Sequence, residues 1–175
     1  MNLRLVKASS EYKDLIIDML DEWKEYNKRH DTDHSPMAIF YEGKDFNDYM
    51  YTLNVLSLNP GQPLVPASTF FALDLDRNIM VGAINIRHYL NDSLLNSGGH
   101  IGDGVRPSER RKGFATEIIR LGLIECKKLG IYKVLISCKK WNQASRKTIV
   151  RNGGVYYRDV NIENETLEQY WIDNN

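Results

Sequence analysis

The sequence has few cysteines and prolines and no long apolar run, and each of these absences excludes a class of protein. Its 175 residues include 2 cysteines and 5 prolines, too few for a disulfide scaffold or a collagen-like repeat. No apolar stretch approaches the roughly 20 residues of a membrane-spanning helix, and the first residues lack the apolar core of a secretory signal. We therefore expect one cytoplasmic domain over residues 1–175, with reduced thiols and no membrane partner.

Net charge is also absent, but the charges are unevenly distributed along the chain. The 23 Lys and Arg balance the 23 Asp and Glu, yet residues 106–151 contain thirteen basic and three acidic residues. The rest of the chain is correspondingly acidic. This asymmetry favours a polyanionic partner for the basic segment and a cationic partner for the remainder. The alternative is that these charges are simply solvated on helix faces.

Hydrophobic periodicity predicts a mixed α/β (α+β) fold. Its expected order is βααβββαβαββ. Helices are expected from Ser9 to about Lys28 and over 46–58, 113–130 and 142–152. Strands are expected over 3–7, 68–75, 79–90, 99–105, 132–138, 155–160 and 167–172.

The segment from Val105 to Thr116, between a predicted strand and a predicted helix, carries the clearest functional signal. A helix start directs unpaired backbone N–H groups and the positive end of the helix dipole at one point, and here arginines surround that start. Gly113 permits close approach of the backbone to a ligand. Walker and dinucleotide spacings are both absent. The segment therefore predicts a phosphate or pyrophosphate site, or else a helix start with solvated arginines.

Two motifs in this half resemble the GCN5-related N-acetyltransferase (GNAT) superfamily. Arg110-x-x-Gly113-x-Ala115 is similar to its pyrophosphate motif, and Asn142-x-x-Ser145, which opens a helix ended by Gly153, is similar to its second motif. The resemblance is strongest over residues 98–157. It implies a GNAT-like mixed, mostly antiparallel sheet flanked by helices. It also implies acetyl transfer from acetyl-CoA to a primary amine by direct attack in a ternary complex, without a metal.

The resemblance also implies which residues bind acetyl-CoA. The backbone near Val105 would pair with the pantetheine arm, Asn142 would contact that arm, and Ser145 would lie near the thiol. Amides of the basic segment would hold the pyrophosphate, while Arg146 or Lys147 could meet the nucleotide phosphates. The implied cofactor residues are Val105, Arg110, Arg111, Lys112, Gly113, Phe114, Ala115, Thr116, Asn142 and Ser145.

An amine must be neutral to attack a thioester, so a general base is expected beside it. His100 and Asp103 both qualify. Strand alternation places them on opposite faces unless a bulge intervenes, as it characteristically does in this superfamily, so both remain candidates.

The proton donor to the departing thiol is less clear. Members of the superfamily frequently use a tyrosine seven residues after the motif asparagine, and this position is Ile149 here. The remaining donors are water, Ser145, Tyr156 and Tyr157.

Several alternatives stay open at this point. The loop His30-Asp31-Thr32-Asp33-His34 has metal-capable side chains but no third anchored ligand, and we expect a solvated loop near the acceptor site. The chain could be an acyl-CoA sensor without turnover. Nucleic-acid binding through the basic segment is disfavoured by the acidic remainder. We expect a cationic small-molecule or peptide amine as acceptor, while a homodimer remains open.

Overall fold

The computed structural model describes residues 1–30 and 35–175 and contains one seven-stranded sheet with the strand order β1-β2-β3-β4-β5-β7-β6. All neighbouring strands are antiparallel except β4 and β5. The expected mixed, mostly antiparallel sheet is therefore confirmed. The strands are β1 (Leu3–Val6), β2 (Ala67–Asp74), β3 (Ile79–Arg87), β4 (Ile101–Val105), β5 (Lys133–Lys139), β6 (Val155–Ile162) and β7 (Glu165–Asp173).

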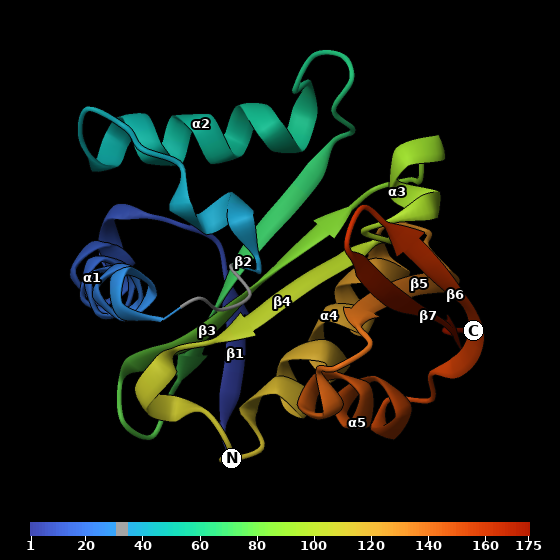
Figure 1. The fold of residues 1–175 in the computed structure, drawn as a ribbon. Helices are drawn as coiled ribbons and strands as arrows, with labels where there is room; N and C mark the ends of the chain where they lie inside the picture. Colours follow the sequence, from blue (N-terminus) through green and yellow to red (C-terminus); the bar gives the residue numbers. More distant parts are fainter. Residues whose placement is uncertain (31–34) are drawn as a thin grey trace.

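Helices cover both faces of the sheet. In Figure 1, α1 and α2 lie on one side of it, and α4 and α5 lie on the other. The helices are α1 (Lys13–Arg29), α2 (Phe46–Leu58), α3 (Asp92–Asn96), α4 (Phe114–Lys128) and α5 (Gln143–Arg151). Single 3-10 turns lie over Ser10–Tyr12, Met37–Phe40 and Pro107–Glu109. The short α3 is an element that the periodicity did not predict.

Each layer of helices has its own apolar cluster against the sheet. The buried stripe of α1, which includes Met19 and Trp23, packs with Phe71 and Ala83. The stripe of α4, which includes Ile118 and Cys126, packs with residues of β3, β5 and β7 on the opposite face. These stripes follow the helical spacing read from the sequence. The sheet is therefore buried on both faces over its central strands.

The sheet is split between β4 and β5. The β3–β4 ladder runs without a register shift from Ile86↔Ile101 to Gly82↔Val105. Among the described residues, by contrast, the ladder between β4 and β5 contains one pair, Ile101↔Ile136, next to an isolated bridge from Gly99 to Ile136. Beyond this pair the two parallel strands diverge. The backbone of β4 after Ile101 and that of β5 after Ile136 therefore face each other across a gap.

Candidate functional site

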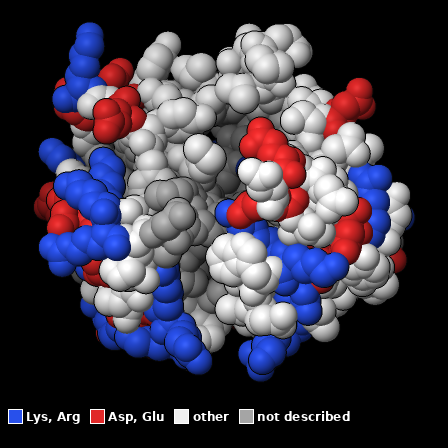
Figure 2. Space-filling model, in the orientation of Figure 1, with Lys and Arg blue, Asp and Glu red and all other residues white. Residues whose placement is uncertain are grey.

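A cavity of about 890 Å³ occupies the gap between the two diverging strands. Its walls come from β4, the end of β5, the loop before α4 and the first turns of α4 and α5. Trp23 and Ser35 line it from the α1 side of the sheet. Figure 2 shows a hollow near the centre of this face of the molecule. Because its lining comes from both sides, the cavity passes through the sheet.

The start of α4 is an exposed set of backbone donors at one wall of this cavity. Gly113 caps the helix with a φ of 89°, and no side chain caps the free N–H groups of the first turn. Arg111 also has a positive φ, of 64°. Such a turn followed by an uncapped helix start favours a bound anion. Except for Lys112, the residues that the sequence assigns to the cofactor line this cavity: Val105, Arg110, Arg111, Gly113, Phe114, Ala115, Thr116, Asn142 and Ser145.

Lys112 is engaged elsewhere, so the expectation that it contributes to the phosphate site is not supported by its placement. Its Nζ donates to Glu109 at 3.1 Å. The same carboxylate accepts hydrogen bonds from both terminal nitrogens of Arg77, at 3.1 and 2.9 Å. The hydrogen bonds from Arg77 hold the pKa of Glu109 below its usual value. Arg77 therefore anchors the loop before α4 to the β2–β3 turn.

Helix α1 anchors the other side of the same loop. Glu22 accepts hydrogen bonds from the Ser108 backbone N–H at 2.8 Å and from the Ser108 hydroxyl at 3.0 Å, and it also binds Arg106. Burial alone raises the pKa of Glu22, but these hydrogen bonds outweigh it and leave the pKa below its usual value. The guanidinium of Arg110 lies over the ring of Tyr26, 4.6 Å from its centroid. The loop is thus held from two directions.

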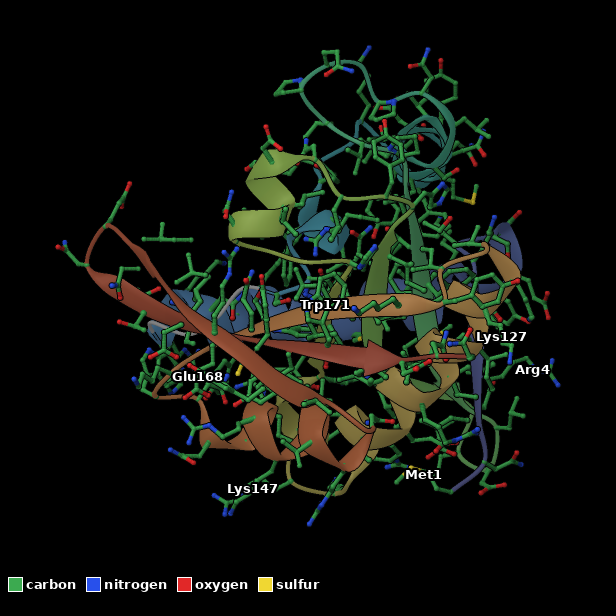
Figure 3. The ribbon with its side chains drawn as sticks, turned by 90° about the vertical axis from the view of Figure 1, so that its right-hand side faces the viewer. Met1, Arg4, Lys127, Lys147, Glu168 and Trp171 are labelled. Carbon is green, nitrogen blue, oxygen red and sulfur yellow. The ribbon has the colours of Figure 1, made fainter. Side chains whose placement is uncertain are left out.

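The basic residues of α5 divide into two groups. Arg146 forms an ion pair with Glu168 through Nε and Nη2, so it is committed to the carboxylate of β7 and is not placed to meet phosphates. Lys147 and Arg151 line the cavity. Figure 3 shows Lys147 projecting outward from α5, while Glu168 lies on the strand above that helix. Lys147 and Arg151, together with Arg111, are the cations placed to meet a polyanionic ligand.

The second motif positions the start of α5 at the cavity. The side chain of Asn142 caps this helix by accepting the N–H of Ser145 at 3.1 Å. Cys138, at the end of β5, lies on the same wall, and it is a lining residue that the sequence did not identify. Burial raises the pKa of its thiol to about 11. A neutral thiol and a serine hydroxyl therefore stand together where the two strands part.

Asp103 is placed in the cavity, whereas His100 is not. The ring Nδ1 of His100 accepts the N–H of Leu135 at 3.0 Å, and the backbone N–H of His100 donates to the Leu135 carbonyl at 2.7 Å. Burial, and then the charge of Arg87, lower its pKa to about 4. With Nδ1 already occupied, the remaining proton is assigned to Nε2. His100 therefore fastens the start of β4 to β5 below the split, and its placement does not support the expected role as a base.

The tyrosines weighed as proton donors lie away from the cavity. Tyr156 donates its hydroxyl to Asp159 at 3.0 Å. Tyr157 lies at a register shift between β6 and β7, is half exposed, and packs its ring against Trp171. The bulge turns Tyr157 outward, so its expected catalytic role is not supported by its placement. Ile149, at the family's usual tyrosine position, is fully buried in the core.

The charge asymmetry of the sequence is partly cancelled in space. Acidic residues from outside the basic segment pair with bases inside it, and Figure 2 shows the two signs of charge interspersed. These pairs are Asp18 and Glu22 with Arg106, Asp159 with Lys140, Glu165 with Lys139, and Glu168 with Arg146. Part of the acidic remainder is therefore neutralised by the basic segment within the protein.

Neither a metal-binding cluster nor a membrane-spanning helix is found among the described residues. Over residues 1–30 and 35–175, no cluster of three or more His, Cys, Asp or Glu is arranged to hold a metal ion. No helix in the same ranges has the length and apolar character needed to cross a membrane. His30 stacks on Tyr26 with ring centroids 4.0 Å apart. The rest of the loop singled out in the sequence, residues 31–34, lies outside the described residues.

A split sheet with an uncapped helix start beside the split defines the class of this α/β protein. The chain belongs to the acetyltransferase (GNAT) domain family, whose profile matches residues 3–155. The superfamily resemblance read from the two motifs is thereby confirmed. A search of curated proteins found no match.

Solved structures of acetyltransferases share the fold at low sequence identity. One is a ribosomal L7/L12 alpha-N-protein acetyltransferase in complex with coenzyme A, which is disulfide-bonded to a cysteine of that protein. It has a TM-score of 0.68 and 16% sequence identity, and the match covers 100% of this chain and 97% of that chain. A ribosomal-protein-S5-alanine acetyltransferase from Vibrio fischeri has a TM-score of 0.68 and 15% sequence identity, and the match covers 99% of this chain and 92% of that chain. A spermidine N-acetyltransferase chimera from Vibrio cholerae has a TM-score of 0.64 and 14% sequence identity, and the match covers 99% of this chain and 96% of that chain.

Proposed function

We propose that the chain transfers an acetyl group from acetyl-CoA to a primary amine by direct attack of the amine on the thioester. The observation that carries this proposal is the cavity itself. It begins at an uncapped helix start with Arg111 and Gly113 beside it and passes through the gap between β4 and β5. A long ligand with phosphates at one end and a reactive group at the other fits this course. Membership of the acetyltransferase family supports the same conclusion.

The chain's own groups account for binding along the cavity. The backbone N–H groups of the first turn of α4, with Arg111, Lys147 and Arg151, would hold phosphates. The edge of β4 from Asp103 to Val105 has no ladder partner on the β5 side in the described structure. Its N–H and C=O groups would bond the amides of the pantetheine arm, as a neighbouring strand would. Asn142 keeps the start of α5 in place at the same wall.

Two side chains would move protons in this reaction. The other cavity carboxylate, Glu109, is committed to Arg77 and Lys112, so Asp103 is our candidate to take the proton from the amine, directly or through water. The amine nitrogen forms a bond to the acetyl carbon as the carbon–sulfur bond breaks. The Ser145 hydroxyl would then protonate the departing sulfur and regain its proton from solvent.

The test combines ligand binding with an acceptor screen. We expect acetyl-CoA to raise the melting temperature of the wild-type protein and to release thiol when a suitable amine is added. Gly113→Asp should lose the thermal shift, because a carboxylate would occupy the phosphate site. Binding without thiol release for any amine would favour a sensor. An absence of any thermal shift in the wild-type protein would overturn the proposal.

A further inference from the structure

The guanidinium of Arg87 lies on the α1 face of the sheet, beside the apex of the split. Arg87 ends β3, and a Cβ added to Gly102 on the neighbouring strand would lie 3.5 Å from both terminal nitrogens of this side chain. Gly102 lines the cavity. The added Cβ would also lie 3.2 Å from the hydroxyl oxygen of Ser35, another lining residue. The guanidinium and the hydroxyl therefore both lie in contact range of the point where a side chain of Gly102 would begin, although Arg87 is not itself a lining residue of the cavity.

This guanidinium differs from three other arginines of the described structure, which are ion-paired. Arg77, Arg106 and Arg146 each bind carboxylates. Within the part of the chain that the structure describes, Arg87 has no carboxylate partner. Its hydrogen bonds run from Nη1 to the carbonyls of Gly98 and Gly99, both at the long distance of 3.4 Å.

Burial without a counter-ion is costly for a charged group. Desolvation of this side chain is strong enough to lower the pKa of Arg87, and its charge also depresses the pKa of the neighbouring His100. A cation of this kind, beside a cavity, is suited to an anion that a ligand supplies. The planar fork of a guanidinium matches the two oxygens of a carboxylate.

The position of Gly102 relative to the split limits how far such a carboxylate can lie from the reacting nitrogen. Gly102 directly follows Ile101, where β4 and β5 part, and directly precedes Asp103. One residue of a strand advances about 3.3 Å. A carboxylate on the Arg87 side of Gly102 therefore leaves only a few bonds between itself and an amine that enters the gap.

We propose that Arg87, with Ser35 beside it, binds a carboxylate of the acceptor, so that the acceptor is an amine carrying a carboxylate a few bonds from its nitrogen. This inference rests on the proposed acetyl transfer and names its acceptor class. It names a different acceptor from the cationic one expected from the charge balance. A free amino acid and the acidic first residue of a peptide present the same chemistry.

The test compares acceptors in matched pairs by thiol release from acetyl-CoA. Free L-amino acids are paired with their primary amides, and peptides that begin with Asp are paired with peptides that begin with Asn. We expect kcat/KM to be at least about tenfold higher for the carboxylate member of one pair series. A preference among free amino acids identifies a small-molecule acceptor, and a preference among peptides identifies an acidic N-terminus. Equal rates within both series would overturn the inference.

Variants of Arg87 then assign the preference to this side chain. Arg87→Gln should remove it by raising KM for the carboxylate acceptor, with KM for acetyl-CoA unchanged, and Arg87→Lys should retain part of it. The matched control is Arg4→Gln, on an exposed position of β1 that Figure 3 shows at the periphery, and it should behave as wild type. A full preference in a folded Arg87→Gln protein would refute the assignment.

A binding measurement covers the case in which the screen finds no turnover. N-Acetylated amino acids and their amides are compared as ligands of wild-type protein by thermal shift with CoA present. A larger shift with the carboxylate member supports the inference, and equal shifts reject it. Failure of acetyl-CoA itself to bind would instead reject the proposed function.

Discussion

Glu22 of α1 binds Arg106, the residue that follows β4, through its Oε2 at 2.5 Å, and so ties the loop of the phosphate site to the opposite helical layer. The same carboxylate receives the N–H of Ser108. The helix start at Gly113 is reached through this loop, so the ion pair and its hydrogen bonds help to set where the helix begins.

We expect Glu22→Gln to weaken both the fold and the binding of acetyl-CoA. Loss of the charge on this partly buried carboxylate should lower the free energy of unfolding by about 1 kcal/mol, or about 2–4 °C in melting temperature. Glu25→Gln is the matched control on the same helix, because Glu25 is exposed and pairs only along α1, with Lys28 and Arg29. Thermal melts with and without acetyl-CoA measure both effects. Equal behaviour of the two variants would show that the Glu22 anchor is unimportant.

Gly113 and Gly153 separate backbone strain from loss of the ligand. Both have a positive φ, 89° and 87°, so alanine at either position should cost about 1–2 kcal/mol of stability. Gly153 has open space around it, follows the end of α5 and does not line the cavity. We expect only Gly113→Ala to weaken acetyl-CoA binding in addition, as measured by titration calorimetry. Comparable affinities for the two variants would argue against a phosphate cradle at Gly113.

The position of His100 predicts a dependence of stability on pH. Its pKa in the folded protein, about 4, lies below the unfolded value of about 6.5. Its contribution is therefore complete above pH 6.5 and is lost as the pH falls from 6.5 towards 4, with a slope of at most about 1.4 kcal/mol per pH unit. His100→Gln should reduce this slope in denaturant titrations, whereas His30→Gln, at an exposed site, should retain it. An unchanged slope in His100→Gln would contradict the burial argument.

Asp103 gives a kinetic prediction. If its carboxylate takes the proton from the amine, Asp103→Asn should lower kcat by about 10²–10⁴-fold near neutral pH. Part of the rate should return at high pH, where the free amine is already neutral. Asp21→Asn, on the exposed side of α1, serves as the control and should keep the wild-type profile. A loss of rate that is the same at every pH would point to a role for Asp103 in positioning alone.

Cys138 gives a chemical probe of the cavity. A thiol with a pKa of about 11 has about 300-fold less thiolate at pH 7 than an ordinary cysteine of pKa about 8.5, so alkylation should be slow and should accelerate with pH. CoA should slow the modification of Cys138 further. Cys126 is buried in the core beneath α4 and should show no such protection. Mass spectrometry of the two peptides separates the sites. Rapid modification of Cys138 at pH 7 would contradict the burial of its thiol in the cavity wall.

The regular elements could be predicted because their periodicity is local. The expected helix over residues 46–58 coincides with α2, and that over 142–152 differs from α5 by one residue at each end. The missed α3 spans five residues, too short for a helical period to be visible. Its start is marked instead by Asn91, whose side chain accepts the N–H of Leu94 at 2.9 Å.

The site could be predicted only where one stretch of sequence builds it. The loop before α4 and the start of α5 are such stretches, and most of their predicted residues line the cavity. Trp23, Ser35 and Arg87 come from elements far away in the chain, and no spacing rule connects them to Gly102. The hydrogen bond of His100 could not be predicted for the same reason, since its partner Leu135 is 35 residues away.

The divergence of β4 and β5 has a consequence for cooperativity. Strands β1 to β4 form one hydrogen-bonded block and β5 to β7 form another, and the described ladder joins the two blocks at a single residue pair. Packing of α4 and α5 under both blocks supplies most of the remaining connection. A ligand whose amides bridged the gap would restore continuous hydrogen bonding across all seven strands. Amide hydrogens on the two facing edges would then exchange together rather than block by block, so the bound molecule would act as a structural member of the sheet.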